Sequence, residues 1–187
     1  MTEGSHNDVP EIIYTDINEN LTNIRKILNS PSDLIERIFT IGHNGHKCAI
    51  VCIDGLVGKD LVNDQVIHTI QLGMAHAKKE ISSLGNDILM EIEKGVLSTN
   101  ELKKVDTLDK VMLAILSGDT ALFIDGTNQV LLVGSKGWAS RGIEEPMTEA
   151  LVRGPREGFT ENVRTNTVLI RRRVRDPNLR FESHKVG

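Results

Sequence analysis

The side chains best suited to chemistry lie between Arg153 and Arg173, in the stretch RGPREGFTENVRTNTVLIRRR. Arginines and glutamates are interleaved there, so the chemistry that they suggest is charge pairing, within the domain or with a neighbouring protein. The loop 154–158 stands just before a predicted helix N-terminus, which also makes it a candidate pocket for an anion. Both interpretations concern binding, and neither involves a reaction.

The same stretch predicts the elements that position these side chains. The loop 154–158 contains two glycines and a proline, which predict irregular backbone. Thr160 is a good N-cap for the helix that follows, and the charges of Glu157 and Glu161 suit the positive end of its dipole. The pair Asp176-Pro177 is expected to end the helix, because the residue before a proline is driven out of the α region.

The apolar spacing of this helix predicts which of its faces is buried. Val163, Ile170 and Val174 form one stripe, which we expect to face the core. Arg171 to Arg173 are consecutive, so at about 100° per residue they spread over much of the helix circumference. At least one of them is expected to lie against a partner surface, paired with a carboxylate or a carbonyl. A solvated basic helix end is the alternative.

This segment resembles the signature of the A subunits of spore germinant receptors. The resemblance extends to Trp138, Arg141, Glu144-Glu145-Pro146 and Glu149, and to the segments SGDTALFIDG (117–126) and IDGLV (53–57), so that it covers roughly residues 45 to 187. The positions that it marks as interaction or signature residues are Arg153, Gly154, Pro155, Arg156, Glu157, Gly158, Phe159, Thr160, Glu161, Arg164, Asn166, Arg171, Arg172 and Arg173.

The resemblance also implies a function and a location. The chain would be the soluble N-terminal signalling and assembly domain of an A subunit, which triggers spore germination together with B and C subunits. The receptor would lie in the spore inner membrane with this domain on the cytoplasmic (core) side, and its membrane domain is expected beyond residue 187. Sister A subunits would form a ring-like ion channel, and the B subunit would hold the nutrient. Arg172→Ala in the intact receptor is then expected to impair assembly or signalling.

Two alternatives stay open on the sequence alone. The domain could bind a small-molecule nutrient between subdomains, or it could belong to a paralogous sporulation membrane protein that shares these signatures. An enzyme is not expected, because the chain has no G-x-S-x-G motif. The glutamates between 144 and 149 are expected to pair with nearby arginines rather than to act as acid and base. No cofactor is expected.

Composition and charge narrow the class of protein. The chain of 187 residues is 39% hydrophobic and 26% charged, as in globular proteins. It has no run of about 18 apolar residues and no secretory signal pattern. The net charge of −4 divides into −7 for residues 1–136 and +3 for residues 137–187, so the basic end could bind an acidic surface, a sister subunit or lipid headgroups. Nucleic acid is disfavoured, because this basic end lacks interleaved aromatic residues.

The cysteine, histidine and glycine residues could in principle form a disulfide, a metal site or a nucleotide-binding loop, but their positions favour none of these. Cys48 and Cys52 are predicted on the same face of one strand, about 13 Å apart, which is too far for a disulfide. We interpret them as core thiols of a reducing compartment. His43 and His46 have metal-compatible spacing but no further ligand nearby, so no metal is expected. The glycines between 55 and 58 match neither common nucleotide-binding fingerprint.

The predicted fold class is mixed α/β, with a small sheet rather than a doubly wound one. Residues 1–14 are predicted to be a disordered arm, 15–40 an N-terminal helical hairpin, and 41–187 an α/β domain with a helical insertion at about 58–118. The resemblance implies a two-subdomain α/β arrangement, with part of the second subdomain missing or incomplete here.

Individual elements follow from local patterns. Ile17, Leu21, Ile24 and Leu28 predict a helix face, after which Leu34, Ile35, Ile38 and Phe39 are read as a second short helix. A buried strand is predicted over 48–53 and a β-hairpin over 121–134, with its turn at 125–128. Apolar faces at 61–70, 81–92 and 105–116 predict three helices within the insertion. The second of these helices is predicted to end at Gly95. The third is predicted to have a capped start at Ser98 with Glu101 and to end at Gly118.

Overall fold

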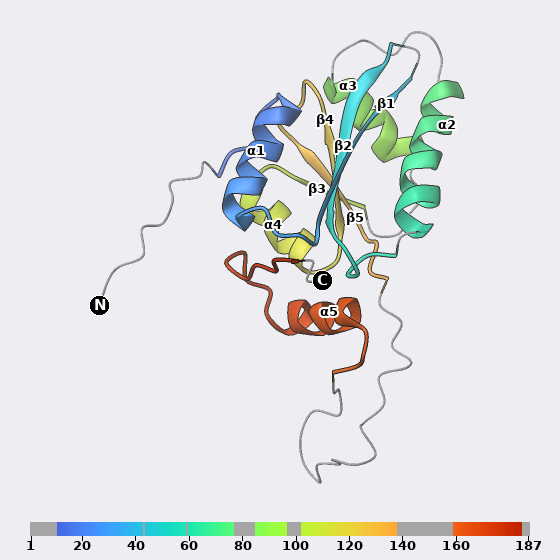
Figure 1. The fold of residues 1–187 in the computed structure, drawn as a ribbon. Coiled ribbons are helices and arrows are strands. Elements are labelled where there is room, and N and C mark those ends of the chain that lie inside the picture. The colour runs from blue at the N-terminus through green and yellow to red at the C-terminus, as the bar shows by residue number, and fades with distance from the viewer. Residues whose placement is uncertain are drawn as a thin grey trace.

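The structure, a computed structural model, describes residues 11–42, 44–58, 60–76, 85–96, 102–137 and 159–184. These residues form an antiparallel sheet with helices on both faces (Figure 1). The strands are β1 (Leu34–Ile41), β2 (His46–Ile53), β3 (Leu102–Val105), β4 (Thr120–Ile124) and β5 (Val130–Val133), in the order β1-β2-β4-β5-β3. The predicted class, mixed α/β, is confirmed.

The helices cover the sheet in two layers. Helices α1 (Ile17–Leu28) and α4 (Leu108–Leu116) lie on one face. The other face carries η1 (Leu61–His68), which is π-helical and continues into α2 (Thr69–His76), and α3 (Gly85–Glu91), which continues into η2 (Ile92–Val96). Helix α5 (Val163–Arg173) lies apart from both layers, at one end of the sheet (Figure 1).

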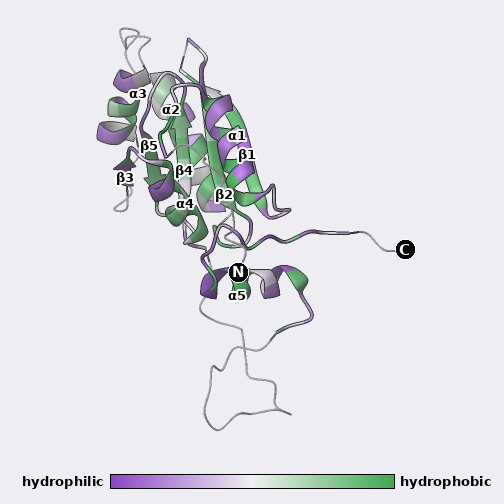
Figure 2. Ribbon diagram, turned by 90° about the vertical axis from the view of Figure 1, so that its left-hand side faces the viewer, coloured by the Kyte–Doolittle hydropathy of each residue, from purple (hydrophilic) through white to green (hydrophobic). Residues whose placement is uncertain are grey.

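Two hydrophobic cores result, one on each face of the sheet. The central strands β2, β4 and β5 alternate their apolar side chains between the two cores, so that Val51 packs towards α1 and α4 while Ile50 packs towards α2 and α3. Figure 2 shows hydrophobic residues concentrated on these strands. Strands buried on both faces read as continuous apolar runs, which is why CAIVCI and ALFI were recognisable in the sequence.

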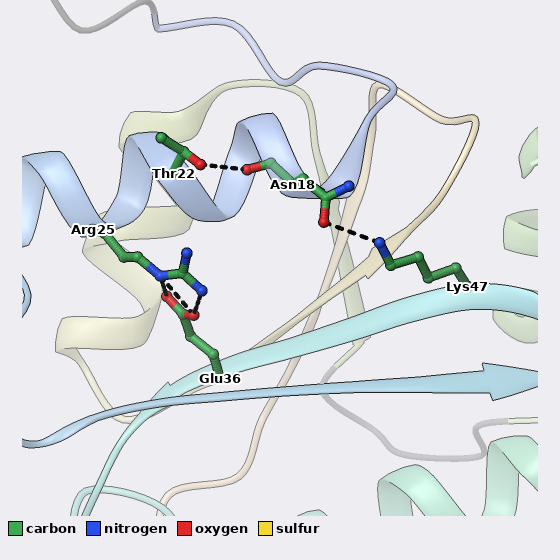
Figure 3. A network of polar contacts seen from close by, with 5 residues as sticks. All are labelled: Asn18, Thr22, Arg25, Glu36 and Lys47. Carbon is green, nitrogen blue, oxygen red and sulfur yellow. Dashed lines mark hydrogen bonds and ion pairs between the residues drawn. The ribbon is translucent and has the colours of Figure 1, made fainter.

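Helix α1 forms as its sequence predicts. The Asp16 carboxylate caps its N-terminus by accepting a hydrogen bond from the Asn18 backbone N–H at 2.7 Å, and Asn29 ends it in the left-handed region. Its outer side is tied to the β1–β2 hairpin by polar contacts, including the Arg25–Glu36 ion pair (Figure 3). The predicted helix face Ile17, Leu21, Ile24 and Leu28 is buried.

The second half of the predicted N-terminal helical hairpin is wrong. Residues 34–41 form the strand β1, which pairs with β2 along its whole length around a turn in which Gly42 and Gly45 have positive φ. A short apolar run does not distinguish a strand from a buried helix by its periodicity. Here the backbone pairing offered by β2 decides, and the β-branched residues suit it.

Three further expectations need correction. Residues 11–14 were assigned to a disordered arm, yet Ile12 forms a bridge with Thr107 and Ile13 is buried. The helical insertion 58–118 is interrupted by the strand β3, which pairs with β5. Gly95 lies inside η2 rather than after it. Ser98 and Glu101 lie outside the described residues.

The predicted hairpin at 121–134 is confirmed, as β4 and β5, with Gly126 at φ +84° in its turn. The strand predicted over 48–53 also joins this sheet, because β2 pairs with β4. Cys48 and Cys52 are free, buried and on the same face of β2. Burial, reinforced by nearby Asp125, raises the pKa of Cys48 to about 12. Burial, reinforced by Asp54, raises that of Cys52 to about 11.

Candidate interaction site at helix α5

A short network of polar side chains caps the N-terminus of helix α5. The Asn162 side chain caps the helix by accepting a hydrogen bond from the Thr165 backbone N–H at 3.2 Å. The predicted N-cap, Thr160, lies two residues earlier, where its backbone N–H donates to the Asn166 side-chain oxygen at 2.7 Å and its carbonyl accepts from the Asn166 amide, also at 2.7 Å. The prediction of Thr160 as N-cap is therefore wrong by two residues, although the helix is real.

The predicted buried stripe of α5 is also wrong. Val163 and Val174 are 75% and 43% exposed. The buried residues of the helix are Leu169 and Arg171, and Val168 packs against the core shared by α1 and α4. The helix is thus rotated so that an arginine faces inwards and Val163 and Val174 face outwards, while Ile170, the third residue of the stripe, is half-buried.

Arg171 is the centre of the contact between α5 and the domain. Its side chain is 1% exposed and forms a bidentate pair with Asp33, with Nε to Oδ2 at 2.8 Å and Nη2 to Oδ1 at 2.9 Å. Nη1 donates to the Leu179 carbonyl at 2.7 Å, and the guanidinium carbon lies 5.0 Å from the centroid of the Phe181 ring. A buried arginine is compatible with folding only when its charge and donors are satisfied in this way.

A second set of contacts joins α5 to the turn after β2. Arg164 Nη2 lies 2.6 Å from Asp54 Oδ1, on a more exposed part of the surface. Gly55 has φ +82°, and a Cβ placed there would lie 2.3 Å from Val168 Cγ2. Only glycine therefore allows the turn to adopt this conformation and the helix to approach so closely.

The β1–β2 hairpin brings the two carboxylates together. Leu34 is opposite Ile53 in the register, and the Asp54 backbone N–H donates to the Asp33 carbonyl at 2.7 Å. Arg164 and Arg171 are seven residues apart, so they lie about two turns along one side of α5. Two adjacent acids thus meet two arginines of one helix, an arrangement that neutralises charge and fixes the orientation of α5.

The segment after α5 returns to the same place. The Ser32 backbone N–H donates to the Phe181 carbonyl at 3.0 Å, and the Ser32 and Ser183 hydroxyls are 3.1 Å apart. Residues 174–184 contain no helix or strand and make a turn at 177–178. Arg171 therefore holds the chain that follows α5 as well as the helix itself.

The remaining signature residues divide into three groups. The first group is exposed and consists of Phe159, at 70%, Glu161 and Arg173. The second is Arg172, which is half-buried at the end of α5. Arg172 and Arg173 also take part in interactions of their own. The rest lie outside the described residues: Arg153, Gly154, Pro155, Arg156, Glu157 and Gly158, together with Trp138, Arg141, Glu144, Glu145, Pro146 and Glu149.

Sequence reasoning missed the partners of the arginines. Asp33 comes just before the residues for which a second short helix is predicted, and Asp54 comes just after the predicted strand 48–53, so local patterns give neither carboxylate a partner. Arg171 and Asp33 are 138 residues apart in the sequence, so no local sequence pattern contains both of them. The one available signal was IDGLV, which the resemblance marked and which contains Asp54 and Gly55.

Other chemistry has little support among the described residues. They contain no cluster of three or more His, Cys, Asp or Glu side chains that could hold a metal ion. A surface depression of about 380 Å³ beside α1 is lined by Tyr14, Asn18, Glu19, Thr22, Asn23 and Lys26. Within the described ranges, every helix is too short or too polar to traverse a lipid bilayer.

The chain is similar in sequence to known proteins. The chain is 36% identical over 169 residues to the Bacillus cereus spore germination protein GerLA, covering 90% of this chain and 33% of GerLA. It is 35% identical over 175 residues to the uncharacterized membrane protein YfkQ of Bacillus subtilis, covering 94% of this chain and 32% of YfkQ. The chain thus spans about a third of the length of these relatives.

A solved structure has the same fold. It is the crystal structure of the N-terminal domain of the A subunit of the Bacillus megaterium spore germinant receptor GerK3, with a TM-score of 0.72 and 26% sequence identity. The match covers 94% of this chain and 61% of that one. A model of the family described as Bacillus/Clostridium GerA spore germination protein matches residues 22–187. The chain therefore belongs to the GerA family of spore germination proteins.

Proposed function

We propose that the chain is the N-terminal domain of the A subunit of a nutrient germinant receptor, or of a paralogous sporulation membrane protein, and that it acts in signalling and subunit assembly. Its membership of the GerA family supports a role in spore germination. B and C subunits and sister A subunits are the proposed partners. The proposed location is the spore inner membrane, with this domain on the cytoplasmic side.

One observation carries the signalling and assembly role: Arg171 is buried within the domain, where Asp33, the Leu179 carbonyl and the Phe181 ring satisfy it. Arg171 of the arginine-rich signature therefore acts by joining parts of the domain. It couples the β1–β2 hairpin to α5 and to the chain that follows, so a movement of one is transmitted to the other. We infer that this buried ion pair fixes one position of α5 relative to the β1–β2 hairpin.

We also propose that the domain is not an enzyme. Arg164 and Arg171 are paired with carboxylates, and the two core thiols are kept protonated by their raised pKa values. A catalytic arginine would need its donors directed at a substrate, and a nucleophilic thiol would need a lowered pKa.

The test uses the whole receptor in spores. Arg171→Ala is expected to abolish or strongly slow nutrient-triggered germination, whereas the matched variant Arg25→Ala, which removes an ion pair on the outer side of α1, leaves it unchanged. Immunoblots of the A, B and C subunits then separate failed assembly from failed signalling. Wild-type germination together with wild-type subunit levels in Arg171→Ala spores would refute the proposal.

The structure makes Arg171, rather than the Arg172 suggested by the sequence, the more informative arginine to mutate. Arg172 is half-buried and makes contacts of its own, so Arg172→Ala is still expected to impair the receptor. Arg171→Ala is expected to impair it more, because Arg171 carries the contact with Asp33 and the following chain.

Nutrient binding by this domain is the second candidate function. The loop 154–158, the anion pocket suggested by the sequence, lies outside the described residues, and the polar depression beside α1 supplies another possible place. Titration calorimetry of the domain with amino acids and sugars at millimolar concentration, a range suited to weak contacts, distinguishes the candidates. A heat of binding that is lost in a Lys26→Ala variant would favour the nutrient site, and the absence of heat would exclude it.

A further inference from the structure

Helix α5 has a second apolar face, which points away from the domain. At about 100° per residue, Val163, Ile170 and Val174 lie within an arc of about 40°, and Val168, which packs inwards, lies on the other side of the helix. Val163 is 75% exposed and Val174 is 43% exposed. Phe159, four residues before Val163 in the segment that precedes the helix, is 70% exposed. We call Phe159, Val163, Ile170 and Val174 the outer stripe.

The outer stripe lies in the most basic part of the described chain. Residues 159–184 contain six arginines and three carboxylates, and two of these arginines, Arg164 and Arg171, are neutralised by Asp54 and Asp33 elsewhere in the domain. Arg173 and Arg175 flank Val174 directly and are exposed. Apolar side chains bordered by arginines are the pattern of helices that lie in the surface of a membrane.

The position of α5 suits such a contact. The helix lies across one end of the sheet, outside both helical layers (Figure 1), and mixes hydrophobic and hydrophilic residues along its length (Figure 2). Its inner side is already held by Asp33, Asp54 and the core. None of these contacts involves a residue of the outer stripe.

We propose that the outer stripe and its flanking arginines bind the surface of a membrane that contains anionic lipids. Phe159, Val163 and Val174 would enter the boundary between headgroups and acyl chains, and Arg175 would approach the lipid phosphates. A second copy of the chain is a poorer partner, because a contact between two such stripes would bring the exposed arginines beside Val174 of both copies together. This inference rests on the geometry of α5 and not on the proposed receptor function.

The test is cosedimentation of the 187-residue chain with vesicles. Wild-type protein is expected to bind vesicles of equal parts phosphatidylcholine and phosphatidylglycerol, to bind phosphatidylcholine vesicles far more weakly, and to be released by high salt. Val163→Asp and, separately, Arg175→Glu are each expected to weaken binding at least about tenfold. Met90→Asp, at an apolar position on α3 that is 46% exposed, is the matched control and is expected to bind as the wild type does.

Several results would overturn the proposal. These are failure of the wild type to bind anionic vesicles, equal binding to neutral vesicles, or binding that neither α5 variant changes. Sedimentation velocity tests the other occupant of the stripe: a dimer that Val163→Asp disrupts, without vesicle binding, would assign the stripe to a second copy. Circular dichroism verifies that the variants are folded, which their exposure predicts. A negative vesicle result leaves the germination phenotype of Arg171→Ala untouched, so the two proposals fail separately.

Discussion

Replacing Asp33 by alanine tests directly whether the buried ion pair holds α5 in place. The substitution removes both oxygens that accept hydrogen bonds from Arg171 Nε and Nη2. The guanidinium, 1% exposed in the native domain, would keep only the Leu179 carbonyl and the Phe181 ring. Its charge would then be buried without a counter-charge.

The expected cost follows from burial. Removing one partner of a buried ion pair costs about 3–5 kcal/mol, whereas loss of an exposed pair costs about 0–1 kcal/mol. The Asp33 side chain is 12% exposed, so water can reach part of the site and the lower value, about 3 kcal/mol, is expected. The double variant Asp33→Ala/Arg171→Met removes both charges and is expected to cost less than the sum of the single variants by about 2 kcal/mol.

The assay combines two measurements. Urea unfolding followed by circular dichroism gives the free energy of unfolding, and Glu36→Ala, which breaks the more exposed pair with Arg25, is the matched control, expected to stay within about 1 kcal/mol of wild type. Hydrogen exchange of the α5 amides detects a helix that detaches without unfolding of the core. If Asp33→Ala changed neither the unfolding free energy by more than about 1 kcal/mol nor the exchange of α5, the buried pair would not hold the helix.

Three further predictions concern the turn after β2, the thiols and the helix cap. Gly55→Ala is expected to cost about 1–3 kcal/mol more than Gly45→Ala in urea unfolding, because both have positive φ but only the Cβ at Gly55 meets α5; equal costs would contradict the close approach. The pKa values of Cys48 and Cys52 are raised in the folded domain, so unfolding releases protons above pH 9.0. The stability that the protonated thiols contribute is therefore fully present below that pH and is expected to fall towards pH 12, and to fall less steeply in the Cys52→Ala variant. A urea midpoint that does not change over this pH range would argue against this expectation. Asn162→Ala removes the cap and is expected to cost about 1 kcal/mol, seen as faster hydrogen exchange in the first turn of α5, and unchanged exchange there would show that the cap contributes nothing.

Much of the fold could be predicted because it depends on local patterns. The α1 face, the β4–β5 hairpin and the buried strand β2 each have a periodicity or turn chemistry that a short window contains. β1 could not be assigned in this way. Its eight residues suit a short helix or a strand, and the choice was made by hydrogen bonding to β2.

The orientation of α5 shows where local reasoning stops. Local patterns sufficed to predict that a helix lies there and that it ends before Asp176-Pro177, and they left open whether one of three consecutive arginines is buried or all are solvated. The sequence also supplied a regular apolar stripe, which was read as the buried face. Only the tertiary structure decided that Arg171 turns inwards, because its partner Asp33 is 138 residues away and reaches it through the register of β1 and β2. A neutralised arginine, each of whose three side-chain nitrogens donates a hydrogen bond, fills that space, and Val163 and Val174 are left on the outside.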